Sequence, residues 1–209
     1  MRVPSDRRFG AVTVIGGALL LVVYAGLFPF ALPFGPGRFD YVTILASPWW
    51  LPLTGTAMVG VLCLLVGLDS VYAMCRPTAG ISAWLGFLAL KIALVLQACA
   101  LTWELLLDPV IAKQPAAQFL FHDAVFLTDP AIGAFRVTAA ATIVVGVVLF
   151  GAALFRSGFV PRPAVVLIGL GAFGYAGGSL LSVYWAVGGI ITLGIGCALI
   201  GRTLWGTTA

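Results

Sequence analysis

Charge is what this sequence has least of. Lys, Arg, Asp and Glu make up 9% of its 209 residues, while hydrophobic residues make up 62%; soluble domains carry about 25% charged residues. Because so few charged residues cannot cover a water-facing surface, most of the surface must face lipid. We therefore expect a single integral membrane domain over residues 1–209, built as an all-α polytopic bundle because helices satisfy their own backbone hydrogen bonds in lipid.

Histidine and cysteine are also scarce. His122 is the only histidine, which excludes a haem held by two imidazoles and weighs against a hydrolase triad. A zinc ion at His122 would need Asp123 or Asp129 plus other ligands, so we interpret His122 as a surface residue near lipid headgroups. The four cysteines form no zinc or redox pattern and are expected to be free, buried thiols. The sequence thus predicts no catalytic residues and no metal site, and it leaves any cofactor unknown.

A basic stripe of the kind that follows a phosphate backbone is missing as well. The net charge is +4, but the basic residues are scattered at the ends of apolar stretches. We expect no nucleic-acid partner.

What the sequence does have is long apolar stretches. A spanning helix needs about 20 apolar residues. Residues 163–201 contain no charge, and one helix of that length would be about 58 Å long, so a turn is expected at Ser182–Gly189. Residues 109–129 are too polar to span and are expected to lie on the membrane surface. Six spans are predicted, roughly at 9–30, 49–75, 80–107, 131–155, 163–182 and 187–205.

The basic residues predict the orientation of these spans. With the N-terminus inside, seven Lys or Arg residues fall on the cytoplasmic side and two, Arg38 and Lys113, on the outer side. Cytoplasmic loops carry the excess of Lys and Arg, so both termini are expected in the cytoplasm, in a multi-pass protein of the cell (inner) membrane. The seven are Arg2, Arg7, Arg8, Arg76, Arg156, Arg162 and Arg202.

Apart from Arg202 at the cytoplasmic end of the last span, four charged residues lie within predicted spans, where each costs about 2.5–3.5 kcal/mol on insertion scales. Glu104 and Arg136 fall at similar depth on neighbouring antiparallel spans and are expected to form a structural ion pair. Lys91 lies near the middle of its span, and Asp69 is close enough in depth to pair with it. We predict that Lys91 points into the bundle, toward Asp69 or a polar cavity. These two residues are the candidate ligand-binding site, with Lys91 as the anchor for an anionic or polar group.

Glycine patterns concern packing here. Gly169-x-Gly171-x-x-Gly174 matches the dinucleotide fingerprint in letters, but it lies in a charge-free span without the strand, turn and acidic residue that the motif requires. Gly174, Gly178 and Ser182 are spaced four apart and predict close helix packing. Gly194 with Ala198, and Cys197 with Gly201, suggest matching small faces on span six, so spans five and six are expected to pack tightly.

The chain resembles an uncharacterised family of bacterial membrane proteins with about six spans, a domain of unknown function. The resemblance is carried by residues 44–47 (Ile-Leu-Ala-Ser) before span two and by a basic residue in span three. It is also carried by the loop at 155–161 (Phe-Arg-Ser-Gly-Phe-Val-Pro), which is similar to the family's aromatic-Arg-Ser-aromatic-x-Pro loop but has a glycine after the serine. Lys91 stands where that family has arginine, which puts a shared bidentate role in doubt. The resemblance implies six spans and no known activity.

These observations favour a protein that binds or transports a small or lipophilic molecule within the bundle, since charges at membrane depth often mark such pathways. The alternative is a structural or accessory subunit of a larger membrane complex. A membrane enzyme is the weakest hypothesis. The expected partners are the lipid bilayer, with a lipophilic small molecule and other membrane subunits as candidates.

Overall fold

The structure is a computed structural model, and it describes residues 4–32, 41–76, 80–122, 129–181 and 183–206. These residues form helices and turns, without any strand in the described ranges, which confirms the all-α class. The long helices are α1 (Pro4–Ala31), α3 (Trp50–Cys75), α4 (Ile81–Leu106), α8 (Pro130–Ser157), α9 (Arg162–Leu181) and α10 (Val183–Gly206). The short elements are α2 (Tyr41–Ala46), α5 (Asp108–Ala112), a 3-10 turn (Pro115–Ala117) and α6 (Phe119–His122).

Five helices in the described part of the chain are long and apolar enough to cross a membrane. They are Arg7–Ala31, Trp50–Cys75, Ile81–Ala112, Pro130–Ser157 and Val183–Gly206. The fifth predicted span coincides with α9, a helix of 20 residues. The turn expected at Ser182–Gly189 is too long, because α10 already begins at Val183.

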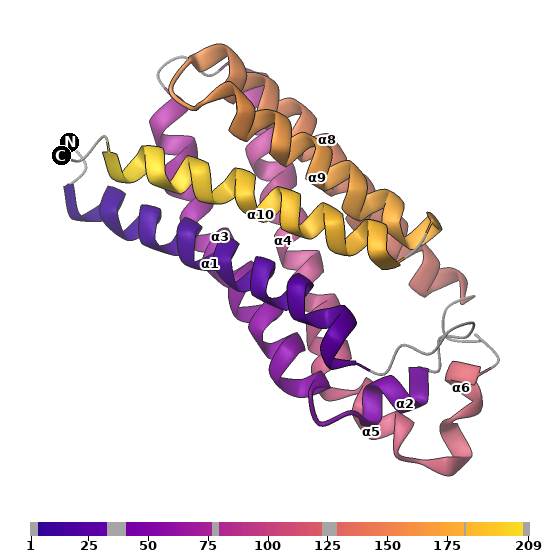
Figure 1. The fold of residues 1–209 in the computed structure, drawn as a ribbon. Helices are drawn as coiled ribbons and strands as arrows, with labels where there is room; N and C mark the ends of the chain where they lie inside the picture. Colours follow the sequence, from indigo (N-terminus) through magenta and orange to yellow (C-terminus); the bar gives the residue numbers. More distant parts are fainter. Residues whose placement is uncertain (1–3, 33–40, 77–79, 123–128, 182, 207–209) are drawn as a thin grey trace.

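The six long helices form a closed ring in which each packs against two others. The order around the ring is α1, α3, α4, α8, α9 and α10, and α10 packs back against α1. Neighbours run antiparallel, so α1 begins and α10 ends at the same end of the bundle (Figure 1). We call this the terminal end, and we call the opposite end, where α2, α5 and α6 lie, the cap end.

Glycines allow the backbones of several neighbours to come very close. Between α1 and α3, a Cβ added at Gly17 would lie 2.7 Å from the Gly60 carbonyl oxygen. Between α9 and α10, a Cβ at Gly174 would lie 3.1 Å from Gly189 Cα, and one at Gly178 would collide with the backbone of Ala186. Small residues permit such packing in membranes, where there is no hydrophobic drive between helices.

The glycine prediction needs one correction. Gly174 and Gly178 do lie against α10, and Ser182 is outside the described residues. On α10, however, Gly194 and Gly201 face Ala18 and Ala11 of α1. These glycines therefore close the ring against α1, which sequence spacing could not reveal because α1 and α10 are at opposite ends of the chain.

A second, smaller core lies at the cap end. It contains Leu32, Ile44, Leu45, Trp50, Leu53 and Ala112, which come from the end of α1 and from α2, α3 and α5. Tyr41–Ala46 is helical and buries Ile44 and Leu45 there. This packing holds the ends of α1, α3 and α4 together beneath α2 and α5.

Candidate functional site

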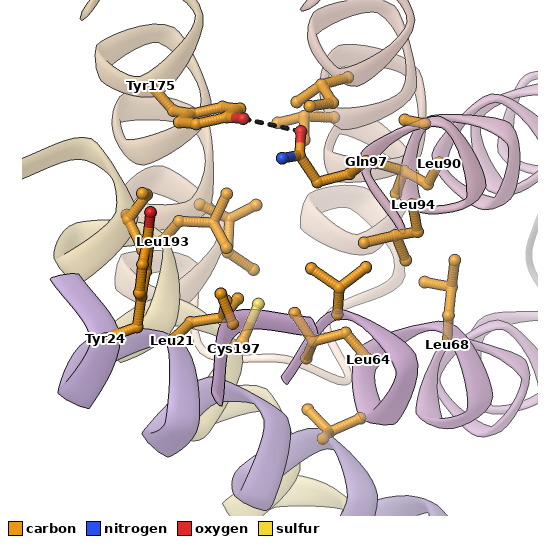
Figure 2. Close-up of a pocket in the computed structure, with 18 of the residues that line it drawn as sticks. Leu21, Tyr24, Leu64, Leu68, Leu90, Leu94, Gln97, Tyr175, Leu193 and Cys197 are labelled. Atoms are coloured by element: carbon orange, nitrogen blue, oxygen red, sulfur yellow. Dashed lines mark hydrogen bonds between the residues drawn. The ribbon is translucent and has the colours of Figure 1, made fainter. Parts of the chain in front are cut away.

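The ring of helices encloses a cavity of about 320 Å³. All six long helices contribute to its lining (Figure 2). Most of the lining side chains are aliphatic, as in typical small-molecule pockets, which are apolar and hold a few placed polar groups. Leu21, Leu64, Leu90, Leu94 and Leu193 are examples.

A few polar side chains also line the cavity: Tyr24, Gln97, Glu104, Tyr175 and Cys197. Gln97 and Glu104 are seven residues apart on α4 and therefore share a helix face, about 10 Å apart along the axis. Glu104 is the nearer of the two to the cap end, because α4 begins at the terminal end and ends at Leu106. Tyr24 lies in the last third of α1, which also runs toward the cap end. The polar groups Tyr24, Gln97, Glu104 and Tyr175 are called the polar pole below.

One hydrogen bond crosses the polar pole. The Tyr175 hydroxyl donates to Gln97 Oε1 at 2.7 Å (Figure 2). The two residues come from α9 and α4, which are separated in the ring by α8. Within the described ranges, the Gln97 Nε2 and the Tyr24 hydroxyl have no protein partner and remain available to a ligand.

Glu104 is held in place through its backbone. The indole nitrogen of Trp50 donates to the Glu104 carbonyl oxygen at 2.6 Å, which fixes the end of α4 against the start of α3. The side chain lines the cavity, and no hydrogen bond or ion pair joins its carboxylate to another described side chain. Its nearest charge interactions are with Asp108 and Arg136.

The predicted Glu104–Arg136 ion pair is not formed at contact distance in the described part of the chain. The two residues interact electrostatically at longer range, and Arg136 is exposed. The prediction of a structural ion pair is therefore not confirmed.

Tyr41 on α2 indicates how these charges are grouped. Burial raises the pKa of its phenol; Arg136 lowers it, and Glu104 and Asp108 raise it. All three charged residues are thus close enough to act on one phenol at the cap end. Asp108 is itself buried, and its Oδ1 has no hydrogen-bond partner among the described residues.

Lys91 and Asp69 lie together, as the sequence predicted, but outside the cavity. Lys91 Nζ is 2.8 Å from Asp69 Oδ2, and the side chains are 33% and 51% exposed. Lys91 Nζ also lies 5.2 Å from the centre of the Phe87 ring, which stacks on Tyr72 at 4.4 Å. Neither charged residue lines the cavity, and a ligand-binding role for them stays a prediction.

The cysteines are in part as expected. Cys63, Cys75, Cys99 and Cys197 form no disulfide. Cys75 is buried, but Cys99 is exposed, so the expectation that all four thiols are buried is wrong. The outward position of Cys99 follows from helix geometry, since it is two residues from Gln97 and side chains two apart point in different directions.

Of the polar pole, sequence reasoning singled out only Glu104, as an ion-pair residue, and missed Tyr24, Gln97 and Tyr175. The available signal was the seven-residue spacing of Gln97 and Glu104, which predicts two polar side chains on one face of an apolar helix. Tyr24 and Tyr175 gave no comparable signal, because tyrosines also serve at membrane interfaces.

The geometry defines a class of protein: an all-α bundle with membrane-length helices around an internal cavity of small-molecule size. No family model, no curated protein and no solved structure matches the chain. The resemblance to the bacterial family stays a prediction, and the functional argument depends on the cavity.

Proposed function

We propose that this chain binds a lipophilic small molecule inside its ring of six helices, as a carrier or a transporter in the membrane. The observation that carries the proposal is the cavity of about 320 Å³, apolar over most of its length and polar at one pole. Pockets of roughly 300–1,000 Å³ with this character typically bind small ligands. A molecule with an apolar tail and a polar end matches both parts of the lining.

The proposal includes six spans, with both termini in the cytoplasm, in the cell (inner) membrane. The arginines at the terminal end support it, since Arg7, Arg76, Arg156, Arg162 and Arg202 lie in or beside helix ends there. At the cap end, Lys113 is exposed just after α5. An excess of basic residues on one side is typical of the cytoplasmic side.

The test is to measure what purifies with the protein. Val147 on α8 lines the cavity and is 6% exposed, whereas its neighbour Val148 is 49% exposed on the outer surface. Val147→Phe adds a ring into the cavity, and Val148→Phe adds the same ring outside it. Protein purified in mild detergent is extracted with organic solvent, and the small molecules are quantified per chain by mass spectrometry.

We expect a lipophilic molecule near one per chain in the parent and in Val148→Phe, and much less in Val147→Phe. If the cavity contents are equal in the two variants, the molecule is bound elsewhere and the proposal is wrong.

A second function, an accessory subunit, is favoured by the Lys91–Asp69 pair. These half-exposed charges lie on the outer surface of α3 and α4 within membrane-length helices. Charged side chains in membranes usually face protein or water, so a partner subunit covering the pair would shield it from lipid. A stoichiometric protein partner that is present with the parent and lost with Lys91→Met would support this function. The absence of any stoichiometric partner from the parent would oppose it.

A further inference from the structure

We infer that the ligand carries a positive charge at its polar end: an amphiphilic cation of the alkylammonium type, with its head against the Glu104 carboxylate and its tail among the cavity leucines. This inference rests on the proposed function and adds the chemical class of the ligand. It differs from the sequence-based expectation of an anionic group at Lys91, because Lys91 lies outside the cavity.

The first argument is the charge of the cavity lining. Glu104 is the one ionisable acid that lines the cavity in the described part of the chain, and no Lys, Arg or His lines it there. An anionic ligand would therefore meet a carboxylate and no compensating cation. A neutral ligand would offer Glu104 no opposite charge, whereas an ammonium group would form a charge-assisted hydrogen bond with its carboxylate.

The second argument is that no neighbouring base pairs with the Glu104 carboxylate by contact. Glu104 interacts with one further acid, Asp108, and with one base, Arg136. Arg136 is exposed and is not within ion-pair distance of Glu104, whereas Asp108 is buried. No base in the described part of the chain therefore contacts the Glu104 carboxylate, and a bound ammonium group would supply that contact.

The third argument is that aromatic rings line the cavity beside the polar pole. Tyr24 and Phe28 line the cavity and meet edge to face, with ring centres 5.4 Å apart. Tyr24 and Tyr175 line the same cavity as Glu104, from α1 and α9. Aromatic faces attract ammonium groups, most strongly when these are desolvated.

The experiment compares three ligands that share one tail. Octylammonium, octanol and octanoate are titrated at neutral pH into nanodiscs of phosphatidylcholine that contain the protein, and the heat from protein-free nanodiscs is subtracted. The variants are Glu104→Gln, which keeps the shape of the side chain and removes its charge, and Asp108→Asn, which removes a nearby charge outside the cavity lining.

For the parent we expect octylammonium to bind about tenfold or more tightly than octanol, as a charge-assisted hydrogen bond supplies, and octanoate to bind more weakly than octanol. In Glu104→Gln the preference should fall to within about twofold, while octanol still binds and so reports an intact cavity. Asp108→Asn should retain most of the preference.

Equal binding of octylammonium and octanol to the parent would overturn the inference and leave the proposed function intact. An equal loss of the octylammonium preference in Glu104→Gln and Asp108→Asn would also overturn the inference. The preference would then come from the overall negative potential and not from contact with Glu104. Failure of all three ligands to bind the parent would contradict the proposed function itself.

Discussion

The Tyr175 hydroxyl donates a 2.7 Å hydrogen bond to Gln97 Oε1 although their helices are not neighbours in the ring. The bond therefore reaches across the cavity and ties α9 to α4 over α8. Because both groups face an apolar cavity, few alternative partners are available to them. The same two side chains therefore supply polar groups to the cavity and hold α9 and α4 at a fixed separation.

Removing that hydroxyl should loosen the ring measurably. Tyr175→Phe is expected to lower the free energy of unfolding in bicelles by about 1 kcal/mol, the usual net value of one hydrogen bond. Tyr184→Phe is the matched control, because Tyr184 is 65% exposed on α10. Equal losses in the two variants would show that the bond across the cavity does not contribute.

Two adjacent glycines on α9 should respond in opposite ways to the same change. A methyl group at Gly178 would collide with the α10 backbone, while one at Gly177 meets nothing within 4 Å. Gly178→Ala is expected to destabilise by about 1–3 kcal/mol through overpacking. Gly177→Ala should stabilise by up to about 1 kcal/mol, the difference in helix propensity. Similar stabilities for the two variants would contradict the observed contact between α9 and α10.

The Lys91–Asp69 pair should behave as a coupled unit. Lys91→Met keeps the side-chain stem and removes the charge, and Asp69→Asn removes the opposite charge. Each alone leaves one partly exposed charge without its partner at 2.8 Å, so each should destabilise, and the double variant should lose less than the sum. The coupling is expected at about 0.6 kcal/mol, the average measured for polar contacts in a membrane bundle, and at no more than about 1.7 kcal/mol. Additive losses would show that the two side chains are not coupled.

The six-span topology can be tested with reporter fusions. A reporter fused after Lys113, at the cap end, and one fused after Ala209 should report opposite sides of the membrane. The physical reason is the gathering of arginines at the terminal end. Reporters on the same side of the membrane would contradict the six-span topology.

The helices were predictable from the sequence because most apolar runs are bounded by residues that typically end a helix, such as a charged residue or a glycine. Arg76 follows α3, and Gly158, with a φ of 69°, ends α8 in the left-handed conformation that favours glycine. The run after Pro163 has no such marker inside it. The sequence predicts a turn that includes Gly189. In the structure Gly189 lies in α10 and allows α10 to approach α9.

The cavity was not predictable, because it depends on which helices become neighbours. The charges at Asp69 and Lys91 drew attention to a pair that contacts as expected but lies on the outside of α3 and α4. Whether an apolar face points to lipid or to a cavity has no signature in residue type, since both surroundings select leucine and valine. Ring closure between α1 and α10 decides this, and it is a contact between opposite ends of the sequence.

The most direct test of the central claim is to map where a lipophilic probe binds. A medium-chain alcohol carrying a diazirine is added to the protein in nanodiscs, activated by light, and its adducts are located by peptide mass spectrometry. We predict adducts on cavity residues such as Leu94, Glu104 and Leu193, with their yield reduced by Val147→Phe and unchanged by Val148→Phe. Adducts confined to lipid-facing residues such as Leu88 and Val95, with the same yield in both variants, would contradict a ligand-binding cavity.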